Sequence, residues 1–142
     1  MAETVLVPPK HAVPTAFTRA QLDWLPCELA AAATSRFNGC LYCASVHARH
    51  AATYSKREAD VQRLLDAGVS VDLGERWNAI VAASVALTAT PSAFGPEHVD
   101  RLRRAGLDDL AISDVIHAAA FFNWANRLML SLGEPATTGS ET

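Results

Sequence analysis

Two cysteines and two histidines near the start of the chain are spaced three, four and three residues apart. They are Cys40, Cys43, His47 and His50. At about 3.6 residues per turn, this spacing places all four side chains on one face of a helix. The Asn-Gly pair at 38–39 is a natural break, so we expect Cys40 in the first turn. Unpaired N–H groups and the positive end of the helix dipole stabilise a thiolate there, so the spacing predicts a helical redox-thiol site.

The rest of the chain carries helical signals, and no stretch alternates apolar and polar residues as a strand does. We expect an all-α fold of about six helices, with helix starts and stops set by Ser, Asp, Pro and Gly residues. A first helix begins at 18 or 23 and carries residues 28–36. The others are expected at 40–53, at 55–68 with a capping box at Ser55–Glu58, at 73–90, at 96–106, and at 108–133 with Asp108 or Asp109 as its cap.

A chain of 142 residues is long enough for one domain with a real core. The helical domain is expected to span 18–133. Residues 1–17 contain three prolines and are predicted to form an extended arm, and the polar residues 134–142 to form a disordered tail. Half of the residues are hydrophobic, many of them alanine, which suits close packing of helices.

The net charge and the cysteine content limit the classes of binding partner and the cellular compartment that we expect for this chain. A net charge of −3 gives no general attraction to nucleic acid or to an anionic membrane. No apolar run is long enough to span a bilayer, and the first residues lack the layout of a signal peptide. With three cysteines, two of them in a CxxC pair, the composition favours a reducing compartment, so we expect a cytoplasmic protein.

Glu28 precedes Cys40 by twelve residues, and Cys43 and His47 follow in the pattern E-x11-C-x2-C-x3-H. This pattern resembles the alkyl hydroperoxide reductase D-like branch of the carboxymuconolactone decarboxylase superfamily. The resemblance implies an all-helical fold assembled as a homo-oligomer, a trimer or a hexamer. The position between the two cysteines, where the original enzymes of the branch have a second histidine, holds Tyr42.

Two further segments resemble the subgroup called peroxidase-related proteins. They are residues 75–77, with the sequence Glu-Arg-Trp, and residues 121–128, with the sequence FFNWANRL. The resemblance covers residues 18–133. It implies a thiol-dependent hydroperoxide reductase that uses no cofactor.

The resemblance also implies a role for each residue of the motif. Cys43 is the thiol that attacks the peroxide, and Cys40 is the thiol that resolves the product into a disulfide. Glu28 and His47 form a proton relay, which requires that Glu28 reach the site from another helix. We expect Cys40 to be the more accessible sulfur. The implied partners are a hydroperoxide substrate and a dithiol reductant, such as a lipoyl-type carrier.

Metal binding is the main rival interpretation, because Cys40, Cys43, His47 and His50 supply a Cys2His2 set. Structural zinc sites usually draw ligands from separated segments, and four side chains on one straight helix cannot surround a tetrahedral ion. We therefore predict no metal held by this set and no tightly bound zinc.

Two other functions fit the chain. One is decarboxylation of a lactone acid, but that branch of the superfamily does not depend on a CxxC pair. The other is a non-enzymatic redox sensor or assembly module, which requires the same dithiol as a peroxidase.

The remaining candidates have predominantly structural interpretations. We expect Cys27 to be a small buried residue and His117 a core histidine. His50 either supports the site residues or is simply exposed, and we favour the exposed position. Tyr42 supports the pocket or an interface. The polar residues of the last helix cap neighbouring helix ends or line the pocket; they are Asn123, Asn126 and Arg127.

Overall fold

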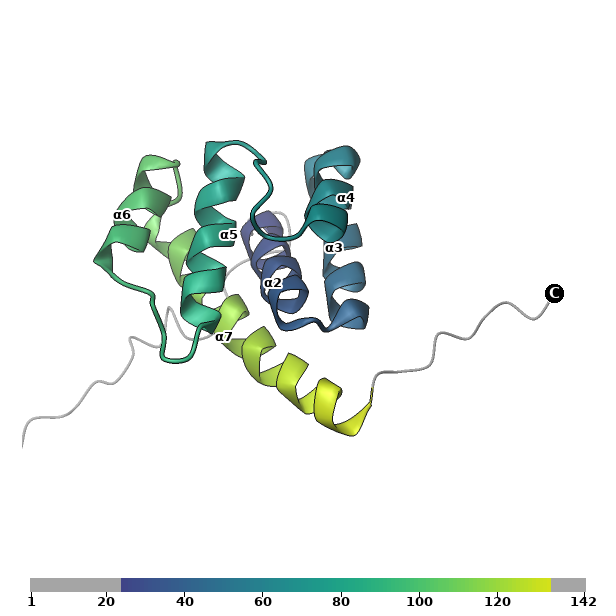
Figure 1. Ribbon diagram of the computed structural model, residues 1–142. Coiled ribbons are helices and arrows are strands. Elements are labelled where there is room, and N and C mark those ends of the chain that lie inside the picture. The colour runs from purple at the N-terminus through teal and green to yellow at the C-terminus, as the bar shows by residue number, and fades with distance from the viewer. Residues whose placement is uncertain (1–23, 134–142) are drawn as a thin grey trace, which may run out of the picture.

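The computed structural model describes residues 24–133, which form six helices and no strand. The helices, shown in Figure 1, are α2 (Trp24–Asn38), α3 (Leu41–Ser55), α4 (Glu58–Ala67), α5 (Glu75–Thr88), α6 (Pro96–Arg104) and α7 (Asp109–Leu132). The predicted all-α fold is confirmed. The predicted arm at 1–17 and the predicted tail at 134–142 lie outside the described residues.

Helix α2 is the centre of the bundle. Every residue from 29 to 35 is buried, and four of the seven are alanines at 30–33. Small side chains allow neighbouring helices to approach closely, and α2 packs against α3, α5 and α7. Figure 1 shows α2 between α5 and α3. The alanines of α2 thus allow three neighbouring helices to pack closely around it.

Large buried side chains from four of the other helices complete the hydrophobic core. Leu64 comes from α4, Trp77 from α5, Leu102 from α6 and Val115 from α7, and each is at most 2% exposed. The guanidinium of Arg57 lies 4.1 Å from the centre of the Trp77 ring, an arrangement that favours a cation over the ring face. This pair joins the turn before α4 to the core of α5.

Most of the predicted helix boundaries are confirmed. Pro26 lies in the first turn of α2, where a proline is tolerated because its missing N–H has no partner in the helix. Pro96 begins α6, and Asp108 caps α7 by accepting a hydrogen bond of 2.8 Å from the backbone N–H of Ala111. Gly133 ends α7 with a φ of 106°.

The capping box predicted at Ser55–Glu58 is wrong. Ser55 is the last residue of α3, and its hydroxyl donates 2.7 Å to the carbonyl of Ala51 and accepts 3.1 Å from the N–H of Arg57. Lys56 then turns the chain with a φ of 58°. Ser55 therefore belongs to the end of one helix rather than to the start of the next, and α4 begins without a side-chain cap.

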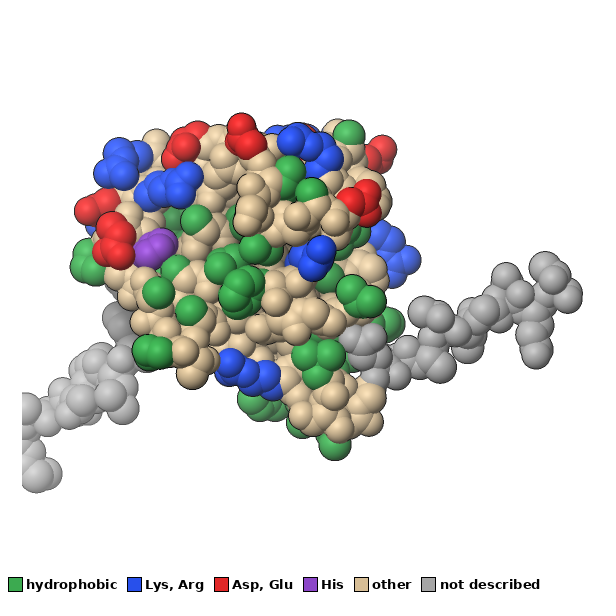
Figure 2. Space-filling view, viewed as in Figure 1, with side chains coloured by type: hydrophobic (Ala, Val, Ile, Leu, Met, Phe, Trp, Pro, Cys, Tyr) green, Lys and Arg blue, Asp and Glu red, His purple; other side chains and the backbone are tan. Residues whose placement is uncertain are grey.

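The C-terminal half of α7 extends beyond the rest of the bundle, as the yellow end of the ribbon shows in Figure 1. It carries large apolar side chains that are at least 44% exposed, namely Phe121, Trp124, Leu128, Leu130 and Leu132. Figure 2 shows hydrophobic side chains at this lower end of the molecule, whereas charged side chains gather mostly at the opposite end. Among the helices of residues 24–133, none has the length and apolar character needed to cross a membrane.

Candidate active site

A tight turn at Gly39 joins α2 to α3. The N–H of Cys40 donates 3.0 Å to the carbonyl of Ser35, and the N–H of Gly39 donates 3.3 Å to the carbonyl of Arg36. This pair of bonds is the Schellman arrangement, which requires a left-handed residue, and Gly39 has a φ of 78°. The Asn-Gly break in the sequence therefore fixes the position of Cys40 relative to both helices.

The two cysteines of the CxxC pair occupy different positions at the start of α3. Cys40 is the residue just before the helix, with φ −81° and ψ 91°, and its side chain is fully buried. Cys43 is the third helical residue and is 5% exposed. The prediction that Cys40 lies in the first turn and is the more accessible sulfur is wrong, because the turn at Gly39 directs Cys40 into the bundle. Cys43 takes the first-turn position instead.

Glu28 and His47 meet across the interface between α2 and α3. Glu28 Oε2 lies 2.6 Å from His47 Nδ1, and their side chains are 15% and 20% exposed. The ring of His47 is also 4.3 Å from the ring of Phe122 on α7, edge to face. A carboxylate only accepts hydrogen bonds, so with Glu28 ionised the proton of His47 resides on Nδ1. Nε2 then carries the free lone pair and can act as a base.

The thiol of Cys43 contacts a thioether. Its Sγ lies 3.2 Å from Sδ of Met129 on α7, and the thiol donates to this weak acceptor. Cys43 precedes His47 by four residues on α3, so the two side chains share one face of the helix. Met129 and Phe122 therefore cover this face from α7, one beside the sulfur and one beside the imidazole.

Polar side chains hold α7 against the α2–α3 turn. Asn38 Nδ2 donates to the side-chain oxygens of Asn123 and Asn126, each at 3.2 Å, and Asn126 Nδ2 donates 3.0 Å to Ser35 Oγ. Asn126 is completely buried. Asn126 lies one turn before Met129 on α7, so this network positions Met129 over Cys43. Asn123 and Asn126 thus bind the end of a neighbouring helix, which is one of the two predicted alternatives.

Several other sequence expectations have mixed outcomes. Cys27 is half-buried rather than buried. His117 is exposed, with Nδ1 2.7 Å from the carbonyl of Ser113, so the predicted core histidine is wrong. His50 is exposed as expected, and Tyr42 is also exposed.

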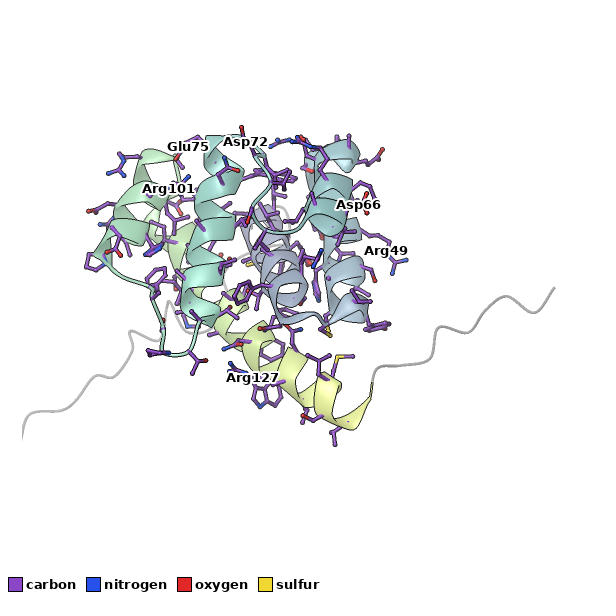
Figure 3. All side chains as sticks on the ribbon, viewed as in Figure 1. Arg49, Asp66, Asp72, Glu75, Arg101 and Arg127 are labelled. Atoms are coloured by element: carbon purple, nitrogen blue, oxygen red, sulfur yellow. The ribbon has the colours of Figure 1, made fainter. Side chains whose placement is uncertain are left out.

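Arg127 also lies on α7, and its label in Figure 3 marks the lower part of the molecule. Its guanidinium donates 3.1 Å to Thr90 Oγ1, beyond the end of α5. This bond joins α7 to the segment that follows α5, so Arg127 also has a structural contact, which fits the structural interpretation of this residue.

No motif in the sequence singles out Met129. It lies on a stripe of α7 with Val115, Ala119, Phe122 and Asn126, at spacings of four, three, four and three. That periodicity marks a face packed against the bundle, which is a signal for burial rather than for proximity to a cysteine.

A group of potential metal ligands also gathers at the α2–α3 interface. Within residues 24–133, Glu28, His47 and His50 each offer one ligand atom, and these atoms lie within 4.8 Å of one another. Glu28 Oε2 is 3.4 Å from His50 Nδ1. The group contains neither Cys40 nor Cys43, so it differs from the Cys2His2 set considered from the sequence.

Comparison with known proteins identifies one family, and solved structures with a similar fold include the following two. The model of the carboxymuconolactone decarboxylase family matches residues 15–86. An uncharacterized peroxidase-related protein from Silicibacter sp. TM1040 has a similar structure, with a TM-score of 0.69 and 24% identity over 82% of this chain. The debrominase Bmp8 is similar with a TM-score of 0.65 and 19% identity, also over 82% of this chain. The match spans 62% of the length of each of these proteins, and no curated protein matches the chain.

Proposed function

Since the chain belongs to the carboxymuconolactone decarboxylase family, we propose that it is a thiol-dependent hydroperoxide reductase. Cys43 is the attacking thiol, Cys40 is the resolving thiol, and His47 and Glu28 form the proton relay. The observation that carries this proposal is the 2.6 Å contact between His47 Nδ1 and Glu28 Oε2, one helical turn beyond Cys43. An imidazole that is oriented by a carboxylate and lies on the same helix face as a thiol is an arrangement that can activate a nucleophilic cysteine.

In the first step, Nε2 of His47 accepts the proton of the Cys43 thiol, and Glu28 stabilises the resulting imidazolium. The thiolate attacks the terminal oxygen of the hydroperoxide, because a thiolate is far more nucleophilic than a thiol. The S–O bond forms as the O–O bond breaks. The departing alkoxide takes the proton from His47 and leaves as an alcohol, and Cys43 is left as a sulfenic acid.

In the second step, Cys40 attacks the sulfur of the Cys43 sulfenic acid. A disulfide forms and the hydroxyl leaves with one proton as water. Cys40 and Cys43 lie three residues apart at the start of α3, so the pair is close in the chain. An external dithiol then reduces the disulfide by exchange and is itself oxidised, which returns both cysteines to thiols. We assign this role to a lipoyl-type or similar dithiol carrier.

The burial of both sulfurs favours small or apolar peroxides. Cys43 is 5% exposed and is flanked by Met129, while Phe122 lies against His47. A peroxide that reaches Cys43 must displace apolar side chains from the face of α3. An alkyl hydroperoxide gains by burying its hydrocarbon part there, about 25 cal/mol per Å2 of apolar surface.

A redox sensor is the second candidate function, and the same burial favours it. Cys40 and Cys43 are at most 5% exposed as residues, which suits slow oxidation of a pair that reports on peroxide more than it removes it. The family name and the similarity to a debrominase do not select the chemistry, because one fold supports many reactions.

The experiment that separates these functions is hydroperoxide consumption with dihydrolipoamide as the reductant. The parent and a Cys43→Ser variant are compared under the same conditions, with a Cys27→Ser variant as the matched control. We expect multiple turnovers of the parent and of Cys27→Ser, and none of Cys43→Ser. A single oxidation without turnover would favour the sensor, and consumption by Cys43→Ser would reject the assigned nucleophile.

We also propose that the chain assembles with copies of itself. The exposed apolar side chains on the protruding half of α7, Phe121, Trp124, Leu128, Leu130 and Leu132, support this proposal, because such a surface is costly to leave in water. Light scattering at micromolar concentration measures the mass directly. A monomer at that concentration would reject the proposed assembly.

A further inference from the structure

We propose that Glu28, His47 and His50 form a binding site for a late first-row divalent cation such as Zn2+, and that an ion at this site blocks the proton relay. The expectation of no zinc from the sequence concerned four side chains of a single helix. The group at the α2–α3 interface is different, because Glu28 reaches it from α2 while the two histidines come from α3.

The distances suit a small ion. In a four-coordinate zinc site with bonds of about 2.0 to 2.2 Å, neighbouring ligand atoms lie about 3.3 Å apart. Glu28 Oε2 and His50 Nδ1 are 3.4 Å apart, which already matches this spacing. Glu28 Oε2 and His47 Nδ1 are 2.6 Å apart because they share a hydrogen bond. Loss of the shared proton to solvent allows these two atoms to separate and to bind the ion together.

The donors and their surroundings suit the same class of ion. Two imidazoles and one carboxylate favour zinc, nickel, cobalt or copper over magnesium or calcium. Glu28 and His47 are 15% and 20% exposed, so two ligands are held in packed surroundings. His50 is 54% exposed and leaves an open side for entry of the ion and for a bound water. Arg49, labelled in Figure 3, points outward from α3 on the side away from α2.

The consequence for the thiol chemistry rests on the proposed function. The ion takes the carboxylate of Glu28 and a nitrogen of His47, which are the two groups that move the proton of Cys43. Binding of the ion and operation of the relay are therefore mutually exclusive. Bound zinc slows oxidation of Cys43, and a chelator restores it.

Isothermal titration of the reduced full-length chain with ZnCl2 tests the site without reference to activity. We expect one zinc per chain, with affinity reduced at least tenfold in Glu28→Gln and in His50→Gln. His117→Gln is the matched control, since His117 is an exposed histidine on α7 bonded to the carbonyl of Ser113. Circular dichroism checks that each variant is folded. No binding by the parent, or equal affinity in His50→Gln, would overturn the proposal.

Two further measurements identify the ligands and the effect. The absorption spectrum of the Co2+ complex is expected to lack the intense near-ultraviolet band of a thiolate ligand; its presence would assign the ion to the cysteines and overturn the site. Saturating zinc is expected to slow peroxide oxidation of the parent at least tenfold, reversibly with a chelator. Binding without inhibition of an active chain would overturn the regulatory step. Binding to a chain without peroxide chemistry would reject the proposed function and leave the cation site standing.

Discussion

Glu28 Oε2 and His47 Nδ1 lie 2.6 Å apart although the two residues are 19 positions apart in the sequence and belong to different helices. The contact joins the only acidic residue of α2 to the face of α3 that also carries Cys43. A partly buried carboxylate at this distance orients the imidazole and stabilises it when it takes up a proton.

Glu28→Gln keeps a side chain of the same size and removes its charge. We expect oxidation of Cys43 by peroxide to slow at least about tenfold, since a positioned acid or base typically contributes a factor of about 100 or more. Stopped-flow measurement of thiol loss gives the rate, and a thermal melt gives the stability. Glu97→Gln, at an exposed glutamate of α6, is the control. If Cys43 is oxidised at the same rate in the parent and in Glu28→Gln, then Glu28 is not part of the proton relay.

The sulfurs of Met129 and Cys43 are 3.2 Å apart, so we expect Met129 to limit access to the thiol. Met129→Ala is expected to increase the rate at which a small thiol reagent modifies Cys43, because Cys43 is only 5% exposed and its sulfur contacts this side chain. Met129→Leu keeps the volume and is expected to stay close to the parent rate. Peptide mass spectrometry resolves Cys43 from the other two cysteines. Identical rates in all three proteins would show that Met129 does not shield the thiol.

Asn126 is fully buried and donates to Ser35 while accepting from Asn38. Asn126→Ala removes both of these bonds and leaves the buried Ser35 hydroxyl without this donor, so we expect a loss of about 2 to 3 kcal/mol in the free energy of unfolding. Asn123→Ala, at a half-buried position with one such bond, is expected to lose less. Urea denaturation measures both. An equal loss in the two variants would argue against a special role for the buried asparagine.

Local signals in the sequence were sufficient for most helix boundaries. Gly39 and Gly133 end helices because their backbone takes positive φ, and Asp108 caps α7 through its own side chain. Each of these effects involves residues within a few positions of one another. The failure at Ser55 is also local, because its hydroxyl bonds back to Ala51 in the preceding helix instead of opening the next. A serine before a charged segment can either end the preceding helix or cap the following one, and the local sequence is compatible with both.

The candidate site was predicted in part. The spacing of Cys43 and His47 on one helix follows from helical geometry, whereas the approach of Glu28 depends on how α2 packs against α3. The contact of Met129 with Cys43 spans 86 positions, and no local pattern specifies it. The burial of Cys40 was missed because the Schellman turn places it before the helix and directs it inward. The exposure of His117 was missed because its apolar neighbours suggested a buried face.

Acid is expected to destabilise the fold partly through Asp60. Hydrogen bonds and the positive charges of Arg57 and Arg63 lower the pKa of Asp60 below its ordinary 3.8. A carboxyl with a lowered folded pKa contributes stability that is complete above its unfolded pKa and is lost as pH falls through the folded value. Asp60→Asn should therefore flatten the fall in melting temperature below about pH 4. If the melting temperatures of the variant and the parent fall equally with pH through this range, the prediction is contradicted.

The most direct test of the thiol mechanism is mass spectrometry after one equivalent of an alkyl hydroperoxide, with a sulfenic-acid trap present. The parent is expected to form a Cys40–Cys43 disulfide, and Cys40→Ser is expected to carry the trap on Cys43. His47→Ala is expected to react more slowly while remaining folded. If the Cys43→Ser variant forms a trapped sulfenic acid on Cys40 at the parent rate, then Cys40 is the attacking thiol and Cys43 the resolving thiol. Oxidation of neither cysteine faster than a free thiol would contradict the peroxidase account.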